Sequence, residues 1–250
     1  MKLIVNADDF GYSIGHNHGI IHAHTHGIVK STSLMANGEE VLHAINLLRQ
    51  HTSLDVGIHV VLDYKRPISN PTLIPTLLDQ NQNFKKFLKD DIYSINLEEV
   101  RFEIESQILF LQSFKLNLSH LDSHHHIHLH PHLFPTFLSI AKKYNLILRL
   151  VKSIDLDHQL LCESEGLKYV FCNTSFYNDT VSLEFFTNYN NDNHIEELMT
   201  HPAFCDETIM RESSYNLKRV EELKVLSNPI IKTMLKSKNI ALISHKDLRD

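Results

Sequence analysis

The sequence predicts an α/β protein whose strands form a parallel sheet or barrel, and three observations support this. Short apolar runs alternate with segments of helical periodicity along the chain. The 250 residues, of which 42% are hydrophobic, are enough to build one large core. Acidic residues and histidines follow several apolar runs, at the carboxyl ends where parallel α/β folds place their sites. We therefore expect one domain spanning residues 1–250.

The amino-terminal part of the chain begins the alternation of strand and helix. Apolar runs predict strands, and the segments between them predict helices. The expected strands are Leu3 to Val5, Ser31 to Met35 and Val56 to Leu62, and the expected helices are the stretch after Ser13 and Glu39 to His51.

An irregular stretch follows, from Asp63 to about Asn96. It is rich in Pro, Asn, Gln and Lys and is too long for a simple connector. Because it comes directly after a strand that carries a histidine, we expect it to form a lid or an oligomer contact.

The middle of the chain contains two helices with a strand between them. Asn96, followed by Glu99, has the pattern of a helix start, and a helix over Leu97 to Leu116 leads into a strand reaching Asp122. Pro131 suits the first turn of the next helix. The apolar positions at helical spacing are Val100, Ile104, Ile108 and Leu111 in the first helix, and Leu133, Phe134, Phe137, Leu138 and Ala141 in the second.

The carboxyl-terminal part continues the same alternation. Pro229 interrupts a long helical pattern, and because proline lacks the amide proton that a helix interior needs, we expect a kink or a split there. The expected strands are Leu146 to Val151, Lys168 to Cys172, Ile195 to Thr200 and Ile240 to Ser244, with a helix over Leu217 to Leu235.

Composition argues against several classes of protein. A net charge of -6 without any run of Lys and Arg argues against nucleic acid as a partner. Cys162, Cys172 and Cys205 are an odd number without a CxxC pair, so we interpret them as ordinary reduced thiols. The start MKLIVNADDFG does not resemble a signal peptide, and no uncharged apolar run is long enough to span a membrane. We expect a soluble, cytoplasmic protein that binds no membrane.

Histidines are concentrated between Ser119 and Pro131, where thirteen residues contain six of them and one aspartate. In an extended chain alternate side chains share a face, so His120, Asp122 and His124 would line one side. A strand ending near His124 would bring imidazole and carboxylate to one place. Of the neighbouring histidines, we expect one or two to line the pocket, and we expect most of those on the first helix to lie round its surface. These are His125, His126, His128, His130 and His132, and His16, His18, His22, His24 and His26.

Two further segments carry groups that bind metals. NADDFG, residues 6–11, follows the first strand, and its adjacent carboxylates could divide the work of binding a cation and holding a proton or water. An isolated pair of aspartates is also a common turn and helix cap. A lone histidine on a buried strand, as at His59, is often a satisfied core residue. Taken together with the histidine cluster, however, the two segments complete an Asp, His, His set that suits a divalent metal with open positions.

Two single residues complete the candidate site. His201, before Pro202, follows an expected strand and could donate a proton to a leaving group, although a His-Pro pair by itself is typical of a turn. Arg149 is a charge inside an apolar strand and therefore needs a carboxylate partner, for which Asp8 is a candidate. A salt bridge of purely structural value explains Arg149 equally well.

Four motifs in order resemble the YdjC-like carbohydrate deacetylases, in their chitooligosaccharide deacetylase branch. They are NADDFG, GIHVVL at 57–62, HLDSHHHIH at 120–128 and THPAF at 200–204. The resemblance implies a distorted, partly open (β/α) barrel of the glycoside hydrolase and deacetylase type, a bound Mg²⁺ or similar divalent ion, and a homodimer. By position, the implied metal ligands are Asp9, His59 and His124, with Asp8 as the base and His201 as the acid.

The resemblance implies removal of an acetyl group from N-acetylated glucosamine oligosaccharides, such as chitobiose, chitotriose and their 6-phosphates. An Asp with two His also accepts Zn²⁺, Mn²⁺ or Co²⁺. Two alternatives stay open, namely metal-dependent hydrolysis of another amide or a phosphoester, and a metal-storage or delivery protein, which the 19 histidines suggest. The chain has no Trp, so aromatic rings that could stack on a sugar are sought among Phe10, Tyr12, Phe176 and Tyr177.

Overall fold

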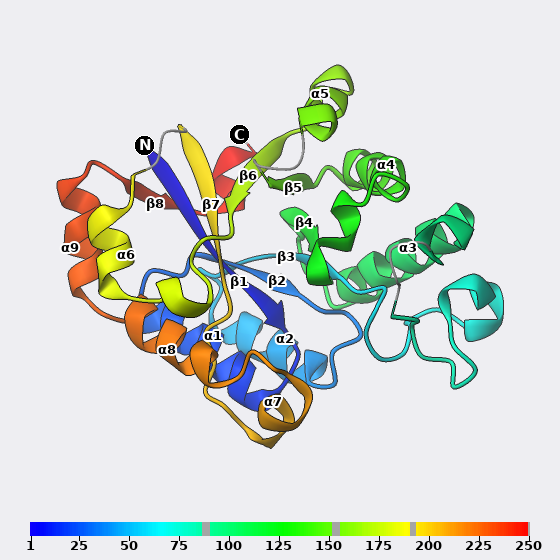
Figure 1. Cartoon of the computed structure of the whole chain (residues 1–250), viewed down its shortest axis with the longest axis horizontal. Helices are drawn as coiled ribbons and strands as arrows, with labels where there is room; N and C mark the ends of the chain where they lie inside the picture. The colour runs from blue at the N-terminus through cyan, green and yellow to red at the C-terminus, as the bar shows by residue number, and fades with distance from the viewer. Residues whose placement is uncertain (87–90, 152–155, 191–193, 250) are drawn as a thin grey trace.

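Eight parallel strands form the centre of the computed structural model, which describes residues 1–86, 91–151, 156–190 and 194–249 (Figure 1). The strand order is β2-β3-β4-β5-β6-β7-β1-β8, and a further pairing of β2 with β1 closes a ring of seven strands. The strands are β1 (Lys2–Phe10), β2 (Ser31–Leu34), β3 (Asp55–Val60), β4 (His120–Ser123), β5 (Ile147–Val151), β6 (Tyr169–Asn173), β7 (Ile195–Thr200) and β8 (Ala241–Ile243).

Helices surround the ring, and side chains before their first turns satisfy free amide protons (Figure 1). The Ser13 hydroxyl accepts a hydrogen bond from the backbone amide of His16 at the start of α1. The side-chain oxygen Oδ1 of Asn96 accepts one from the backbone amide of Glu98 at the start of α3. The helices are α1 (Ile14–His26), α2 (Val41–Gln50), α3 (Leu97–Ser113), α4 (Phe134–Tyr144), α5 (Leu156–Ser164), α6 (Leu183–Asn188), α7 (Glu207–Glu212), α8 (Leu217–Leu226) and α9 (Ile230–Ser237). None of the helices in the described ranges is both long and apolar enough to cross a bilayer.

The seam between β1 and β2 is where the ring is irregular. The amino-terminal half of β1, Lys2 to Ile4, pairs with β8, and only from Asn6 onward does β1 pair with β2. The β1–β2 register then shifts between Ala7 and Phe10. The predicted (β/α) barrel is confirmed, but its ring of seven strands is closed and not partly open. Its distortion lies at this seam, where β8 pairs with the first residues of β1 and β2 pairs with the later ones.

The predicted element order is largely confirmed, with several wrong boundaries and three missed helices. The first strand was expected to end at Val5, but β1 continues to Phe10 and so contains Asp8 and Asp9. Pro131 does not begin a helix, because a short 3₁₀ segment over His124–Leu129 comes first, and α4 begins at Phe134 with Pro135 in its first turn. The predicted break at Pro229 is confirmed as a split between α8 and α9. The missed helices are α5, α6 and α7, all short.

Among its described residues, the stretch predicted to be irregular contains short 3₁₀ turns and one isolated β-bridge between Leu78 and Phe84, and α3 holds part of it in place. The buried Glu103 carboxylate accepts hydrogen bonds from the backbone amides of Ile68 and Ser69, at 3.0 Å each. Glu99 accepts from the amide of Thr76 at 2.7 Å. The roles of this stretch as a lid or an oligomer contact stay predictions.

The barrel interior is polar toward the carboxyl ends of the strands. Side chains alternate along β1, so that Leu3 and Val5 pack in the large core cluster beneath the helices, whereas Ile4 packs with Ile147 and Val170 of β5 and β6. Further along β1, Asp8 pairs with Arg149 of β5 and lies within 4.8 Å of His59 and Asp122 of β3 and β4. The alternation therefore places Ile4 and Asp8 inside the ring and Leu3 and Val5 outside it.

Gly57 on β3 leaves the space that the His120 ring occupies. A Cβ atom at this position would lie 2.4–2.5 Å from three atoms of that ring. The ring cannot withdraw, because its other face stacks on His245 with centroids 3.6 Å apart. We expect Gly57→Ala to lower the free energy of unfolding by about 1–3 kcal/mol through overpacking, measured by urea unfolding.

The His120→Ala background provides the control for this prediction. Without the ring there is room for the added methyl group, so Gly57→Ala should cost clearly less there than in the wild type. Equal costs in the two backgrounds would show that His120 is not what fills the space.

Candidate active site

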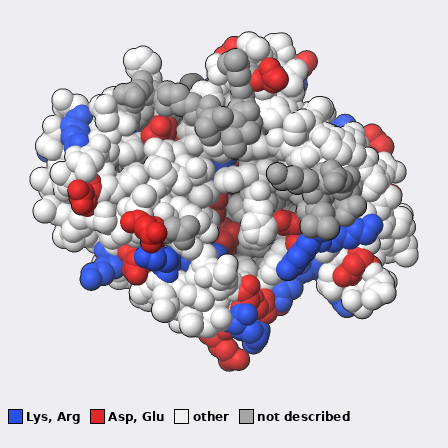
Figure 2. Space-filling view, in the orientation of Figure 1, with Lys and Arg blue, Asp and Glu red and all other residues white. Residues whose placement is uncertain are grey.

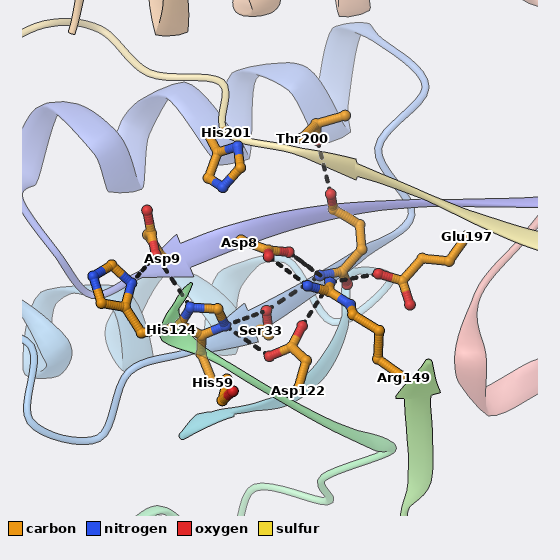
Figure 3. A network of polar contacts seen from close by, with 12 residues as sticks. Asp8, Asp9, Ser33, His59, Asp122, His124, Arg149, Glu197, Thr200 and His201 are labelled. Atoms are coloured by element: carbon orange, nitrogen blue, oxygen red, sulfur yellow. Dashed lines mark hydrogen bonds and ion pairs between the residues drawn. The ribbon is translucent and has the colours of Figure 1, made fainter. Parts of the chain in front are cut away.

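The backbone at the end of β1 allows two consecutive carboxylates to reach the same region. In a regular strand Asp8 and Asp9 would point to opposite faces. Asp9, however, has φ of 62°, a left-handed conformation that is uncommon outside glycine, and it lies where the β1–β2 register shifts. This break in the alternation turns both carboxylates toward the carboxyl-terminal mouth of the barrel (Figure 3).

The structure brings Asp9, His59 and His124 together at this mouth. The Asp9 Oδ1 atom lies 3.2 Å from His59 Nε2 and 3.2 Å from His124 Nδ1. Each of the three residues offers one possible ligand atom, and these three atoms lie within 4.8 Å of one another. The residues come from the ends of β1, β3 and β4, which are separate in sequence and converge because parallel strands end at one mouth (Figure 3).

The environment of His59 fits a metal ligand. Its Nδ1 atom lies 2.7 Å from Asp122 Oδ1 and 3.3 Å from the Ser33 hydroxyl, while Nε2 points to Asp9. Metal-binding histidines commonly donate their other ring N–H to a carboxylate, which fixes the tautomer and the ring orientation. The donor set of one carboxylate and two imidazoles, with a carboxylate behind one imidazole, therefore fits a divalent cation.

The charges around the site also fit a divalent cation. Asp8, Asp9, Asp122 and Glu197 are all buried, and the two guanidinium groups that contact them are those of Arg149 and Arg219. Arginine keeps its charge in proteins. The His59 ring lies between Asp9 and Asp122 and supplies a further positive charge when it is protonated. A cation that replaced this proton would supply positive charge at the same place.

The pKa values in this region follow from the same contacts. Burial raises the pKa of Asp9, but hydrogen bonds from His124 and His59 and the charge of Arg219 outweigh it, so the pKa lies well below its usual value. Burial lowers the pKa of His59, but the carboxylates of Asp122, Asp9 and Asp8 raise it to about 10. A proton and a metal ion therefore compete for His59 Nε2.

Arg149 is the predicted partner of Asp8, and the structure confirms the contact. Its Nη1 and Nη2 atoms donate to Asp8 Oδ2 and Oδ1 at 2.6 and 2.7 Å, a bidentate arrangement. Nη2 also lies 2.6 Å from Asp122 Oδ2 and contacts Glu197 of β7. Burial raises the pKa of Asp8, but the charge and hydrogen bonds of Arg149 lower it far more, so Asp8 is ionised at neutral pH.

His201 lies at the end of β7, on the other side of the site from His124 (Figure 3). Its backbone amide donates to the buried Glu222, and its Nδ1 atom lies 3.9 Å from Glu222 Oε1. The Thr200 hydroxyl before it donates to the Asn6 carbonyl at 2.8 Å, which ties the end of β7 to β1. These contacts fix the position of His201 beside the site.

The sequence did not single out Arg219, Glu222 or Glu197, and it placed Asp122 on the same face as His124 without giving it a role. Arg219 of α8 donates to Asp9 Oδ2 at 3.0 Å, so a helix near the end of the chain contributes to the candidate metal site. Asp122 had a signal, because alternation along β4 places it on the inner face. Arg219 and Glu222 lie in an ordinary helical pattern, which carries no sign of their role.

The histidine cluster divides into different environments. His120 points into the barrel as predicted, but its ring stacks on His245, away from the metal set. The alternation of side chains predicted the correct face of the strand, but not how far along the barrel axis the ring lies. His128 is buried, with Nδ1 at 2.6 Å from Ser123 and Nε2 at 3.1 Å from the Arg149 carbonyl. Burial lowers the pKa of His126 to about 4. The exposed His125 pairs with Asp63 at 2.6 Å.

The prediction for the histidines of α1 was wrong in part. His16 and His24 are buried, and His24 bonds to the Val29 carbonyl at 2.9 Å. The other three, His18, His22 and His26, are spaced by four and therefore share one helix face, where the rings of His22 and His26 stack with centroids 4.3 Å apart.

Among the aromatic candidates, Phe10 and Phe176 cannot stack on a ligand, because both are completely buried. Tyr12 is 5% exposed, whereas Tyr177 is 36% exposed and its ring centroid lies 5.9 Å from that of His201. Tyr64, which was not among the candidates, lies with its ring 5.9 Å from that of His124. Figure 2 shows carboxylates along a hollow near the middle of the face onto which these groups open.

Known proteins match this chain over nearly its whole length. The family model described as YdjC-like protein matches residues 2–237. A carbohydrate deacetylase of Brevibacillus brevis is 37% identical over 99% of this chain and 100% of its own, and a chitooligosaccharide deacetylase of Serratia marcescens is 34% identical over 98% of each. A solved structure from Enterococcus faecalis V583, described as a candidate cellobiose-phosphate cleavage protein, superposes with a TM-score of 0.92 at 30% identity, covering 99% of this chain and 98% of that one. The chain therefore belongs to the YdjC-like protein family.

Proposed function

We propose that the protein is a metal-dependent hydrolase that removes an acetyl group from N-acetylglucosamine units of chitooligosaccharides. The observation that carries the proposal is the convergence of Asp9, His59 and His124 beside an ionised Asp8, with His201 at the opposite side. The names of the relatives support it, since those in Brevibacillus brevis and Serratia marcescens are deacetylases. The proposed substrates are chitobiose, chitotriose or their 6-phosphates.

The residues that would hold the ion are Asp9, His59 and His124. An ion held there would supply a lowered pKa for a water molecule and polarisation of the acetamide carbonyl. Asp122 fixes the His59 ring from behind, and Arg219 holds the second oxygen of Asp9. Mg²⁺ is the ion that the family resemblance implies, and the two imidazole nitrogens also suit Zn²⁺, Mn²⁺ or Co²⁺.

Asp8 is the proposed general base. Because Arg149 keeps it ionised, it can accept a proton from the attacking water at neutral pH. Arg149 itself is held by Asp122 and Glu197, so the carboxylate of Asp8 is fixed in orientation before substrate arrives. The proposed role of Arg149 in catalysis is to position Asp8, the base.

His201 is the proposed general acid. Expulsion of a free amine requires that its nitrogen gain a proton, and an imidazolium at the side of the site away from the metal set can supply it. Glu222 lies behind His201 and accepts a hydrogen bond from its backbone amide, which holds the residue in place. The products are acetate and a sugar with a free amine. We further propose that the enzyme acts as a homodimer in the cytoplasm.

Removal of the metal should abolish the activity. We expect protein treated with a chelator to release no acetate from chitobiose, and one divalent ion per chain to restore release, because the ion activates the water. The measurement is acetate release together with the mass of the sugar product, after addition of Mg²⁺, Mn²⁺, Zn²⁺ or Co²⁺.

The same preparation separates the alternatives. Binding of several ions per chain by the Asp9→Asn variant, with no acetate from any substrate, would favour a metal-storage protein. Turnover of a phosphoester or another amide, without acetate, would favour a different hydrolase. Acetate release that survives complete chelation would contradict the role of the metal.

A further inference from the structure

Four tyrosines and one arginine form a continuous ladder along one wall of the site. The rings of Tyr64 and Tyr12 stack with centroids 5.6 Å apart, and those of Tyr215 and Tyr177 stack at 4.2 Å with 17° between their planes. The guanidinium of Arg219 joins the two pairs, since its Cζ atom lies 5.9 Å from the Tyr12 ring and 5.7 Å from the Tyr215 ring. Aromatic and cationic groups are thus in contact from one end to the other.

The ladder extends from the metal set to the proposed acid. At one end the Tyr64 ring lies 5.9 Å from the ring of His124. At the other end the Tyr177 ring lies 5.9 Å from the ring of His201. Tyr12, Tyr64 and Tyr177 follow β1, β3 and β6, so the ladder lies at the mouth where the candidate site opens.

Hydrogen bonds hold most of the ladder rigidly. The hydroxyls of Tyr64 and Tyr215 donate to Glu212 and Glu222 at 2.5 and 2.6 Å. Arg219 is fixed by Asp9 at 3.0 Å and by the Tyr215 carbonyl at 2.7 Å. A ring held in place loses little entropy when a ligand packs against it.

Tyr177 is the member that can receive a ligand. Tyr177 is 36% exposed, compared with 5% for Tyr12 and 8% for Tyr215, and Tyr64 is partly buried; Tyr215 stacks on the Tyr177 ring. Its backbone amide donates to the Thr180 hydroxyl at 3.0 Å, which ties Tyr177 to the turn that follows it. The chain contains no Trp, and an exposed tyrosine ring is therefore the kind of flat apolar surface that it can offer.

The chemistry of deacetylation places the sugar next to this ring. The acetamide carbonyl must lie at Asp9, His59 and His124, and the nitrogen must lie within reach of His201. The pyranose ring bonded to that nitrogen is then on the His201 side, where Tyr177 lies.

We propose that Tyr177 is the platform on which the pyranose ring of the acetamido sugar packs, with Tyr215 and Arg219 supporting it from behind. This inference rests on the proposed deacetylation. Packing of the apolar C–H face of the sugar against the ring would align the nitrogen with His201 and strengthen binding of every substrate that carries such a ring.

The test compares Tyr177→Ala, Tyr177→Leu and Tyr177→Phe in steady-state hydrolysis of chitobiose. Loss of one aromatic contact corresponds to about tenfold in affinity, so we expect the Ala and Leu variants to raise KM about tenfold and to change kcat much less. Tyr177→Phe keeps the ring and should recover most of the affinity. Tyr169→Ala is the control, because Tyr169 begins β6 at the other end of the barrel and should leave KM unchanged.

Binding without turnover provides a second measurement. In the Asp8→Asn background, calorimetry with chitobiose should show Tyr177→Ala weakening Kd by the same factor of about ten. Unchanged KM and Kd in an otherwise active enzyme would overturn the platform and leave the proposed function intact. A Phe variant as impaired as the Ala variant would also overturn it, since the ring would not be the group that binds. Absence of acetate release from the wild-type protein would instead contradict the proposed function.

Discussion

Asp9→Asn and His124→Ala should each reduce acetate release from chitobiose by more than about 10³-fold while the fold is retained. Each change removes one of three ligands, and with it a metal that contributes several kcal/mol to stabilising the charge of the transition state. Both residues lie at strand ends and not within the apolar core, so their loss leaves the packing of the barrel in place. Acetate release, bound metal per chain and circular dichroism are the measurements.

His130→Ala is the matched control for these variants. His130 belongs to the same histidine-rich segment, but its ring contacts Tyr93 and not the metal set. We expect its activity and metal content to equal those of the wild type. Full activity of Asp9→Asn or His124→Ala would refute the ligand assignment, whereas equal loss in His130→Ala would point to damage to the whole segment.

Arg149→Met should lower the free energy of unfolding by roughly 3–5 kcal/mol, the usual effect of removing one partner of a buried ion pair. The substitution would leave Asp8, Asp122 and Glu197 buried without the guanidinium that they share. For a chain of this size, the melting temperature should fall by about 6–20 °C. Thermal unfolding in the presence and absence of added metal measures the effect.

The effect of Arg149→Met should depend on pH. The stranded carboxylates can take up protons at low pH, which removes their unpaired charges, so the loss of stability should be smaller at pH 5 than at pH 8. Arg101→Met is the control, because Arg101 is an exposed partner of Glu98 at 3.8 Å and should contribute less than about 1 kcal/mol. A loss as small as that of the control would show that Arg149 does not compensate these charges.

Much of the barrel could be predicted from the sequence, because burial leaves a local periodic signal. Inward and outward positions alternate every second residue in a strand, and apolar positions recur every three or four residues in a helix. The runs at Ile195 to Thr200 and Ser31 to Met35 therefore predicted β7 and β2 almost to the residue. The short helices α5, α6 and α7 were missed, because one or two turns give too few repeats for a pattern to be recognised.

The candidate site was predictable only in part. Parallel strands end at one mouth, so Asp9, His59 and His124 could be expected near one another from their places after strands. For His120, the sequence predicted the correct face of the strand but the wrong position along the barrel axis, because that position depends on how neighbouring strands are shifted relative to one another. Arg219 carried no signal at all, since helical periodicity says nothing about which strand end an exposed-looking arginine will reach.

By itself, the sequence determined the order of strands and helices and the kinds of side chain that end the strands. Only the tertiary structure decided which of these groups touch. Arg149 and Asp8 are 141 positions apart, and their 2.6 Å contact depends on the register of β5 relative to β1 around a closed ring. The left-handed backbone of Asp9, which turns two adjacent carboxylates to one mouth, likewise results from the shifted pairing of β1 with β2. Patterns along a short stretch of sequence indicate which side chains are buried. The register of the strands and the closure of the barrel depend instead on contacts between distant segments, and these contacts determine where the charged groups lie.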